Sequence, residues 1–225
     1  LFTAKKPIVH YVRNVFSFIE RPYSPVRYKE LLVAPNEMRN RFIRLINEEI
    51  KNHNTGKPAY IRIKINHITD PLMVKKLYEA EENGVPVDLI VRGNCSLVAG
   101  RPGKGQSMHV VGVIDRYLEH ARIFQFCAAG EDKMFIGSAD WMPRNLNSRV
   151  EVVTPVYDPD IKRELATIIS YALRDNMQGR VVDGTDRNLA WQAGGSLPFR
   201  SQEALYNHYL EEAKSSENIS ADTPA

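Results

Sequence analysis

Cysteine is scarce in this sequence, and long apolar runs are absent from it. Of its 225 residues, two are cysteines, Cys95 and Cys127, which is too few for a disulfide framework and matches no metal-binding spacing. We expect two free thiols in a reduced, cytoplasmic setting, with a disulfide across the sheet as the alternative. No segment is apolar for long enough to cross a bilayer and no signal peptide is visible, while association with a membrane surface stays open.

Charge of one sign is not in large excess either. The formal net charge is +3 at pH 7. The last fifteen residues carry a net charge of −3, from Glu211, Glu212, Glu217 and Asp222 against Lys214, so the rest of the chain carries +6. A basic body of this size suits a polyanionic ligand, although many proteins carry as much charge without binding one.

The spacing of apolar residues predicts an α/β domain. Ile61, Ile63 and Ile65 alternate with polar residues as in a strand. Asp70 followed by Pro71 is typical of a helix start, Asp158 followed by Pro159 repeats this pattern, and Asn36 can cap a third helix. Strands alternate with helices, which favours a layered α/β/α fold with a mixed, largely parallel sheet. The expected strands cover residues 28–34, 60–66, 85–92, 122–126, 134–138 and 150–155, and the expected helices cover residues 7–20, 36–54, 71–84, 158–173 and 201–214.

The chain begins with Leu rather than Met, so we expect a piece of a longer polypeptide. Residues 1–27 would be a helix and linker from a preceding domain, and residues 28–178 would be the main domain. Residues 179–214 would form a C-terminal extension, irregular up to its short helix. Residues 215–225 are polar and are expected to be a disordered tail.

Polar side chains gather where the predicted strands end. Asn66 and Arg92 stand at the carboxyl ends of two strands, the usual edge for ligands in an α/β sheet. His120 precedes a predicted hairpin, and folding of that hairpin brings it toward the loop that follows. Each residue alone has an ordinary structural explanation, such as a satisfied histidine or a surface ion pair, and only the combination favours a site. The candidates are Lys64, Asn66, Arg92, His120, Arg122, Asp140, Arg144 and Asn145.

Two motifs of the hairpin resemble the phospholipase D superfamily. His120-x-Arg122 followed by Gly137-Ser138-x-Asp140 is similar to the His-x-Lys and Gly-Ser-x-Asn signature of that superfamily, in which two such halves build one site. The resemblance implies a phospholipase D-like fold for residues 28–178. Because Arg122 stands where the superfamily has lysine, we expect it to bind phosphate rather than to donate a proton.

A closer resemblance, over most of residues 1–175, is to the C-terminal part of bacterial polyphosphate kinases. It rests on three long motifs in order, Leu-Ile-Val-Arg-Gly-Asn-Cys-Ser-Leu (89–97), Asp-Arg-Tyr-Leu-Glu-His-Ala-Arg-Ile (115–123) and Ser-Ala-Asp-Trp-Met-Pro-Arg-Asn-Leu (138–146). It implies reversible transfer of the terminal phosphate of ATP to polyphosphate through a phosphohistidine in the preceding domain, which would also hold most of the Mg²⁺. His120 would then be a second active-site histidine, and Arg92 would bind nucleotide phosphate.

The same resemblance implies the ligands and partners. ATP, ADP and polyphosphate would contact the candidates, of which Arg92 and His120 would face one basic cavity. The preceding domains and further copies of the full-length protein would be the protein partners, and nucleic acid would not bind. We expect the isolated chain to fold without kinase activity. The alternatives are a phosphodiesterase of the phospholipase D kind and a non-catalytic module that binds polyanions.

Overall fold

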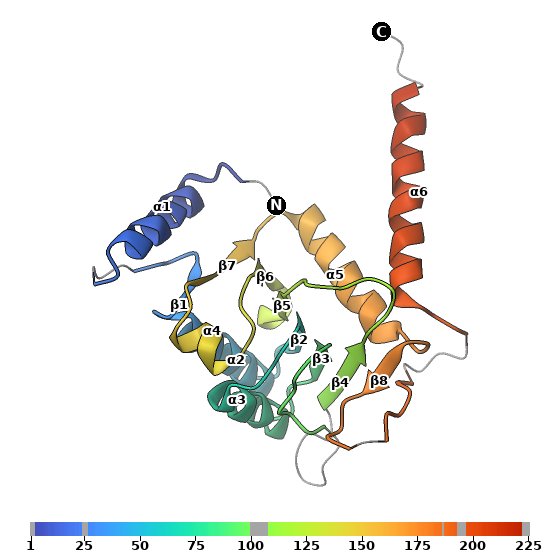
Figure 1. Cartoon of the computed structure of the whole chain (residues 1–225), viewed down its shortest axis with the longest axis horizontal. Helices are drawn as coiled ribbons and strands as arrows, with labels where there is room; N and C mark the ends of the chain where they lie inside the picture. The colour runs from blue at the N-terminus through green and yellow to red at the C-terminus, as the bar shows by residue number, and fades with distance from the viewer. Residues whose placement is uncertain (1–2, 24–26, 100–107, 186, 193–196, 222–225) are drawn as a thin grey trace.

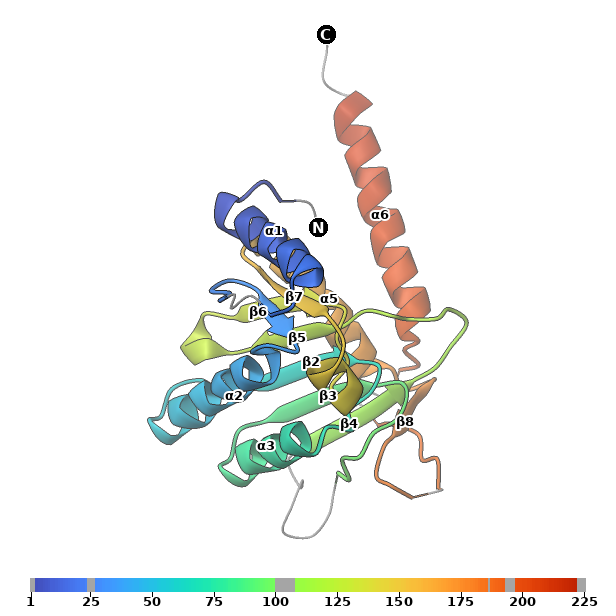
Figure 2. The ribbon, with the colours of Figure 1, turned by 60° about the vertical axis from the view of Figure 1, so that its left-hand side comes forward.

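The computed structural model describes residues 3–23, 27–99, 108–185, 187–192 and 197–221. These residues form one eight-stranded sheet with helices on both faces, and α6 (Ser201–Ala221) projects from this body (Figures 1 and 2). The layered α/β/α prediction is therefore confirmed. The remaining helices are α1 (Lys6–Glu20), α2 (Met38–Asn54), α3 (Pro71–Glu82), α4 (Pro143–Asn147) and α5 (Pro159–Arg174).

The order of the strands in the sheet is β1-β7-β6-β5-β2-β3-β4-β8. Of the seven neighbouring pairs among the described strands, β2–β3 and β3–β4 are parallel and the other five are antiparallel. The strands are β1 (Leu32–Ala34), β2 (Ile61–Ile65), β3 (Val87–Val91), β4 (Met108–Val113), β5 (Ile123–Phe126), β6 (Lys133–Gly137), β7 (Glu151–Val156) and β8 (Gly179–Val181).

The prediction of a largely parallel sheet is wrong. Parallel neighbours need a long crossover, and α3 supplies one between β2 and β3. The strands β5, β6 and β7 instead follow one another as antiparallel neighbours, and β5 pairs antiparallel with β2. The hairpin of β5 and β6, which follows His120, thus pairs directly with β2, the strand that precedes Asn66.

Two apolar cores lie on the two faces of the sheet. On one face, α2 and α3 cover the sheet, and the ring of Phe42 packs against Phe124 and Trp141 with centroids 4.6 and 5.1 Å apart. On the other face, α5 packs Leu165 and Ile169 onto the strands. Each fully buried large side chain of this kind stabilises the fold by about 1.5–3 kcal/mol. The edge of the sheet at which β2 and β3 end is therefore held between two packed layers.

Two of the three helix starts suggested by the sequence are capped as expected. The Asp70 carboxylate accepts a hydrogen bond from Met73 N, and Asp158 accepts from Asp160 N and Ile161 N. Asn36 does not cap α2, because Glu37 N donates to Val33 O and the first helical residue is Met38. The cysteines are free thiols, as predicted.

The C-terminal part departs from expectation in two places. Residues 176–200 contain β8, which pairs antiparallel with β4 and extends the sheet. The last helix does not end at residue 214 but continues to Ala221, so residues 215–221 are not a disordered tail; residues 222–225 lie outside the described residues. Within the described ranges, each helix is too short or too polar to serve as a transmembrane span.

Candidate functional site

Three predicted site residues meet at the carboxyl edge of β2 and β3. Ile65 lies opposite Val91 in the parallel register, which places Asn66 beside Arg92. Arg92 Nε donates a hydrogen bond to Asn66 Oδ1 at 2.5 Å, and Arg92 Nη2 lies 3.1 Å from His120 Nδ1. A guanidinium carries donors and no acceptor, so Nδ1 is the acceptor and the neutral imidazole holds its proton on Nε2. The exposed His120 ring thus presents an N–H at its free side.

Asn66 has a buried donor without a partner. Its side chain is 1% exposed, and Nδ2 has no hydrogen-bond partner among the described residues. The orientation of the amide is set by Arg92, which can only donate and therefore fixes Oδ1 toward itself. Buried polar atoms are rarely left unpaired in native proteins. Among the described residues, Nδ2 is therefore an unsatisfied donor at the junction.

Lys64 is buried on β2 and forms an ion pair with Glu119. The second oxygen of the Glu119 carboxylate accepts a hydrogen bond from Gln202 Nε2 at 3.1 Å. The positive charge of Lys64 is thereby neutralised inside the protein. Its ammonium group supports the loop that carries His120, and it reaches a ligand only if Glu119 moves.

Arg122 and Asp140 form a buried, two-pronged ion pair behind the site. Arg122 Nε and Nη2 lie 3.2 and 3.0 Å from the two oxygens of Asp140, whose Oδ1 also accepts from the backbone N–H groups of Asn66 and His67. Burial by itself would raise the pKa of the Asp140 carboxyl, but the hydrogen bonds and charge of Arg122, with those two N–H groups, hold it below its ordinary value. This pair fixes the end of β2 to the start of β5.

Asn145 and Arg144 lie apart from the junction of Asn66, Arg92 and His120. Asn145 is buried and donates to Glu151 Oε1 at 2.6 Å, while the hydroxyl of Ser138 donates to the other oxygen of Glu151. Arg144 is exposed on α4, and no described residue hydrogen-bonds to its guanidinium. The structure thus joins Asn66, Arg92 and His120 directly and sets Lys64, Arg122 and Asp140 behind them.

The junction stands between two openings. A cavity of about 600 Å³ between α1, α5 and the hairpin is bordered by His120 and Arg122. Another of about 500 Å³, beside β8, is bordered by Arg92 and Arg180. The expectation of one cavity shared by Arg92 and His120 therefore needs correction, because the two side chains touch at the boundary between two cavities.

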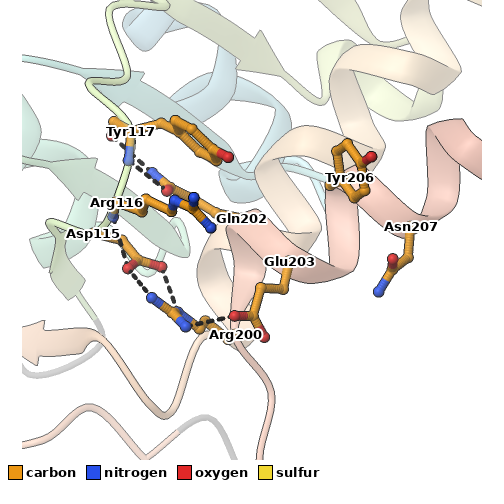
Figure 3. A pocket seen from close by; sticks show the side chains of 8 residues that line it. All are labelled: Asp115, Arg116, Tyr117, Arg200, Gln202, Glu203, Tyr206 and Asn207. Atoms are coloured by element: carbon orange, nitrogen blue, oxygen red, sulfur yellow. Dashed lines mark hydrogen bonds and ion pairs between the residues drawn. The ribbon is translucent and has the colours of Figure 1, made fainter.

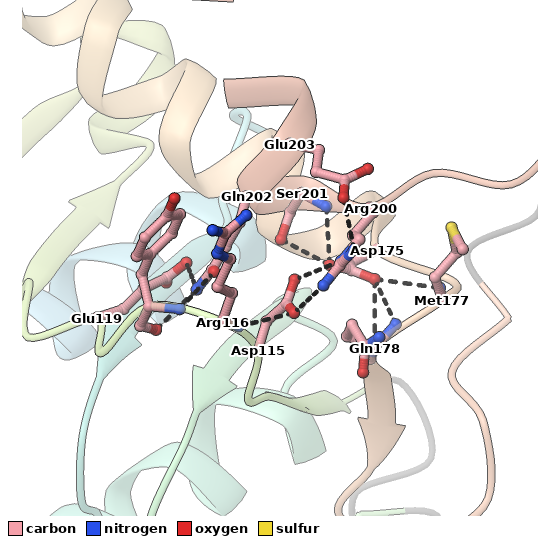
Figure 4. Close-up of polar contacts among 12 residues, drawn as sticks. Asp115, Arg116, Glu119, Asp175, Met177, Gln178, Arg200, Ser201, Gln202 and Glu203 are labelled. Atoms are coloured by element: carbon pink, nitrogen blue, oxygen red, sulfur yellow. Dashed lines mark hydrogen bonds and ion pairs between the residues drawn. The ribbon is translucent and has the colours of Figure 1, made fainter. Parts of the chain in front are cut away.

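Sequence reasoning missed Glu119 and Gln202. Glu119 is adjacent to His120, so its place in the Leu-Glu-His motif was a usable signal. Gln202 comes from the first turn of α6 and carried no such signal (Figure 4). A separate group of possible metal ligands, Glu164, His208 and Glu212, lies between α5 and α6.

Comparisons with known proteins agree with one another. The family model described as polyphosphate kinase C-terminal domain 2 matches residues 31–202. The polyphosphate kinases of Vibrio parahaemolyticus serotype O3:K6 and Escherichia coli strain K12 are each 38% identical to this chain over 208 residues, which are 92% of it and 30% of each relative. The crystal structure of polyphosphate kinase from Porphyromonas gingivalis superposes with a TM-score of 0.89 at 38% identity, covering 95% of this chain and 33% of that chain.

The comparisons confirm the resemblance read from the three motifs. They also show that the chain spans about 30% of the length of the curated relatives that it matches. The match of the family model over residues 31–202 covers the whole sheet and the start of α6. This chain therefore belongs to the polyphosphate kinase family, and its residues 31–202 form the C-terminal domain 2 of that family.

Proposed function

We propose that this chain supplies one wall of the active site of a polyphosphate kinase that transfers the terminal phosphate of ATP to polyphosphate, and back. The observation that supports this most directly is the junction of Asn66, Arg92 and His120, with its unpaired buried donor. The phosphate would pass through a phosphohistidine in a preceding domain. We propose further that the full-length protein is a cytoplasmic homo-oligomer.

Each residue of the junction has a role in this reaction. Phosphoryl transfer depends on positioning and on positive groups aimed at the phosphate oxygens. Arg92 offers a fixed charge, and Asn66 orients its guanidinium by accepting a hydrogen bond through Oδ1. His120 Nε2–H is free to donate to the oxygen that gains negative charge when the P–O bond of ATP breaks and the P–N bond to the phospho-accepting histidine forms. In the second half of the reaction, the terminal oxygen of polyphosphate forms a P–O bond to this phosphate as the P–N bond breaks.

The residues around the junction do not suit Mg²⁺, which prefers carboxylate oxygens. Glu119 is paired with Lys64, Asp140 with Arg122, and the carboxylate of Glu151 accepts from Ser138 and Asn145. We therefore propose that the preceding domain and the phosphates themselves hold most of the Mg²⁺. The ion would supply charge neutralisation to the phosphate chain.

Substitution in the full-length protein tests this function. His120→Ala is expected to lower kcat by about 10²- to 10⁴-fold, the usual contribution of a proton-transfer group. Arg92→Ala is expected to lower kcat/KM for ATP by about 10- to 100-fold, the worth of one or two charged hydrogen bonds. Arg163→Ala, an exposed arginine on α5, serves as the control.

Three outcomes would contradict the proposal. If His120→Ala weakens polyphosphate binding while kcat is kept, the chain is a non-catalytic polyanion-binding module. Hydrolysis of a phosphodiester without ATP would instead favour the phospholipase D alternative. Polyphosphate synthesis by the isolated 225-residue chain with ATP and Mg²⁺ would show that no preceding domain is needed.

A further inference from the structure

The first turn of α6 is hydrogen-bonded to the loop that carries His120. Residues 114–122 connect β4 to β5, and Gln202 contacts this loop at three points (Figure 4). Gln202 Oε1 accepts from Tyr117 N at 2.9 Å, and Nε2 donates to Tyr117 O at 2.9 Å and to Glu119 Oε1 at 3.1 Å. One side chain thus satisfies both backbone groups of Tyr117 and the carboxylate next to His120.

The two residues before Gln202, Arg200 and Ser201, are themselves held in place. Arg200 makes a two-pronged ion pair with Asp115, at 2.8 and 2.6 Å, which ties the start of the same loop to α6. The fully buried Asp175 carboxylate accepts from Ser201 N at 2.8 Å and Ser201 Oγ at 2.6 Å. Figure 4 shows these contacts side by side. The end of α5 therefore fixes the start of α6, and the start of α6 fixes the loop.

A chain of polar contacts continues from Gln202 inward to the site. Glu119, whose one oxygen binds Gln202, binds Lys64 with the other. Lys64 is buried on β2, two residues before Asn66, and Asn66 binds the same guanidinium that contacts His120. The imidazole is therefore reached from two directions, through Arg92 and through the loop. Removal of Gln202 would leave both backbone groups of Tyr117 without these partners and Glu119 held by Lys64 alone among the described contacts.

The surroundings of Gln202 supply a matched control. A cavity of about 430 Å³ is lined by Gln202, Tyr206 and Asn207 on α6, and by Arg116 and Tyr117 on the loop (Figure 3). Asn207 is exposed, and its amide has no hydrogen bond to the described part of the loop. An amide on the same helix and cavity is thus available that does not hold the loop.

We propose that Gln202 is a positioning residue, which acts through Glu119 and the backbone of Tyr117 to keep the imidazole of His120 within bonding distance of Arg92. The inference rests on the proposed function of His120. It goes beyond that function by assigning a catalytic effect to a residue of the C-terminal helix. A residue that only anchored α6 would change stability and leave the chemistry of His120 as it was.

Gln202→Ala in the full-length protein is expected to lower kcat by about 10- to 100-fold, as a misplaced catalytic group does, with the KM for ATP changed much less. Gln202→Glu should be worse than Gln202→Ala, because its carboxylate faces that of Glu119. Asn207→Ala should match the wild type.

Hydrogen exchange of residues 114–121, measured without substrate, separates this proposal from the proposed function. Faster exchange in Gln202→Ala together with lower kcat supports the positioning role. Faster exchange with wild-type kcat, or unchanged exchange, overturns it. If the wild-type protein makes no polyphosphate, the proposed function fails, and the pKa of His120 followed by NMR then decides whether Gln202→Ala alters the environment of the imidazole.

Discussion

Replacement of Asp140 by alanine is the sharpest test of how this site is supported. The sequence suggests a ligand-binding role for Asp140, whereas the structure places its carboxylate against Arg122 and two backbone N–H groups. A supporting residue must stabilise the protein without any ligand. Asp140→Ala should therefore destabilise the ligand-free chain strongly.

The size of the effect follows from burial. The side chains of Arg122 and Asp140 are 10% and 7% exposed, so solvent screens the pair weakly. Removing one partner of a buried pair costs about 3–5 kcal/mol, because the other charge is left without compensation. Asn66 N and His67 N also lose their acceptor, which moves the expectation toward the upper end. For a chain of this length the melting temperature should fall by roughly 6–20 °C.

The assay is urea unfolding of the ligand-free chain followed by circular dichroism. Asp160→Ala is the control, since its ion pair with Arg163 is 76% and 73% exposed and should contribute between about 0 and 1 kcal/mol. Arg122→Ala and the double substitution complete a cycle with an expected coupling of about 1–3 kcal/mol. A loss below about 1 kcal/mol in Asp140→Ala would refute the supporting role and return Asp140 to the ligand-binding candidates.

Two further expectations concern backbone space and pH. Gly137→Ala should destabilise the chain by about 1–3 kcal/mol or more, because an added Cβ would lie 2.4 Å from Val152 O across the β6–β7 ladder; an unchanged urea midpoint would contradict this packing. The pKa values of Asp140, held down by Arg122 against the effect of burial, and of Asp115, held down by Arg200, lie below the ordinary value. The stability that these two carboxylates contribute is present above the unfolded-state pKa of about 3.9 and is lost as the pH falls through the lower folded values. The urea concentration at the midpoint of unfolding should therefore decrease when the pH is lowered below about 4, and it should decrease less in Asp140→Asn.

Local patterns were enough to predict the junction of the site. The alternation of Ile61, Ile63 and Ile65 sets the face of β2, and two adjacent parallel strands end at one edge, so Asn66 and Arg92 had to meet. The helix starts at Asp70 and Asp158 were equally local, because each cap bonds an N–H two or three residues away.

Long-range pairing was beyond such patterns. The antiparallel partner of β2 is β5, and nothing in the alternation of either strand specifies its neighbour or its direction. The roles of Lys64 and Gln202 depend on Glu119, which contacts residues 55 positions before it and 83 positions after it. Long and charged side chains are compatible with both ligand binding and internal pairing, and only their neighbours in space decide between the two.

Asp175 makes the domain depend on the polypeptide that follows it. Its carboxylate collects five hydrogen bonds, two of them from Ser201, at a place that solvent does not reach. A stop codon or a proteolytic cut ahead of position 201 would remove those two donors and the glutamine after them at one stroke. The ribosome must therefore synthesise the beginning of the last helix before the loop that carries His120 can reach its folded conformation. A fusion partner attached at the C-terminal end of that helix would leave the loop undisturbed.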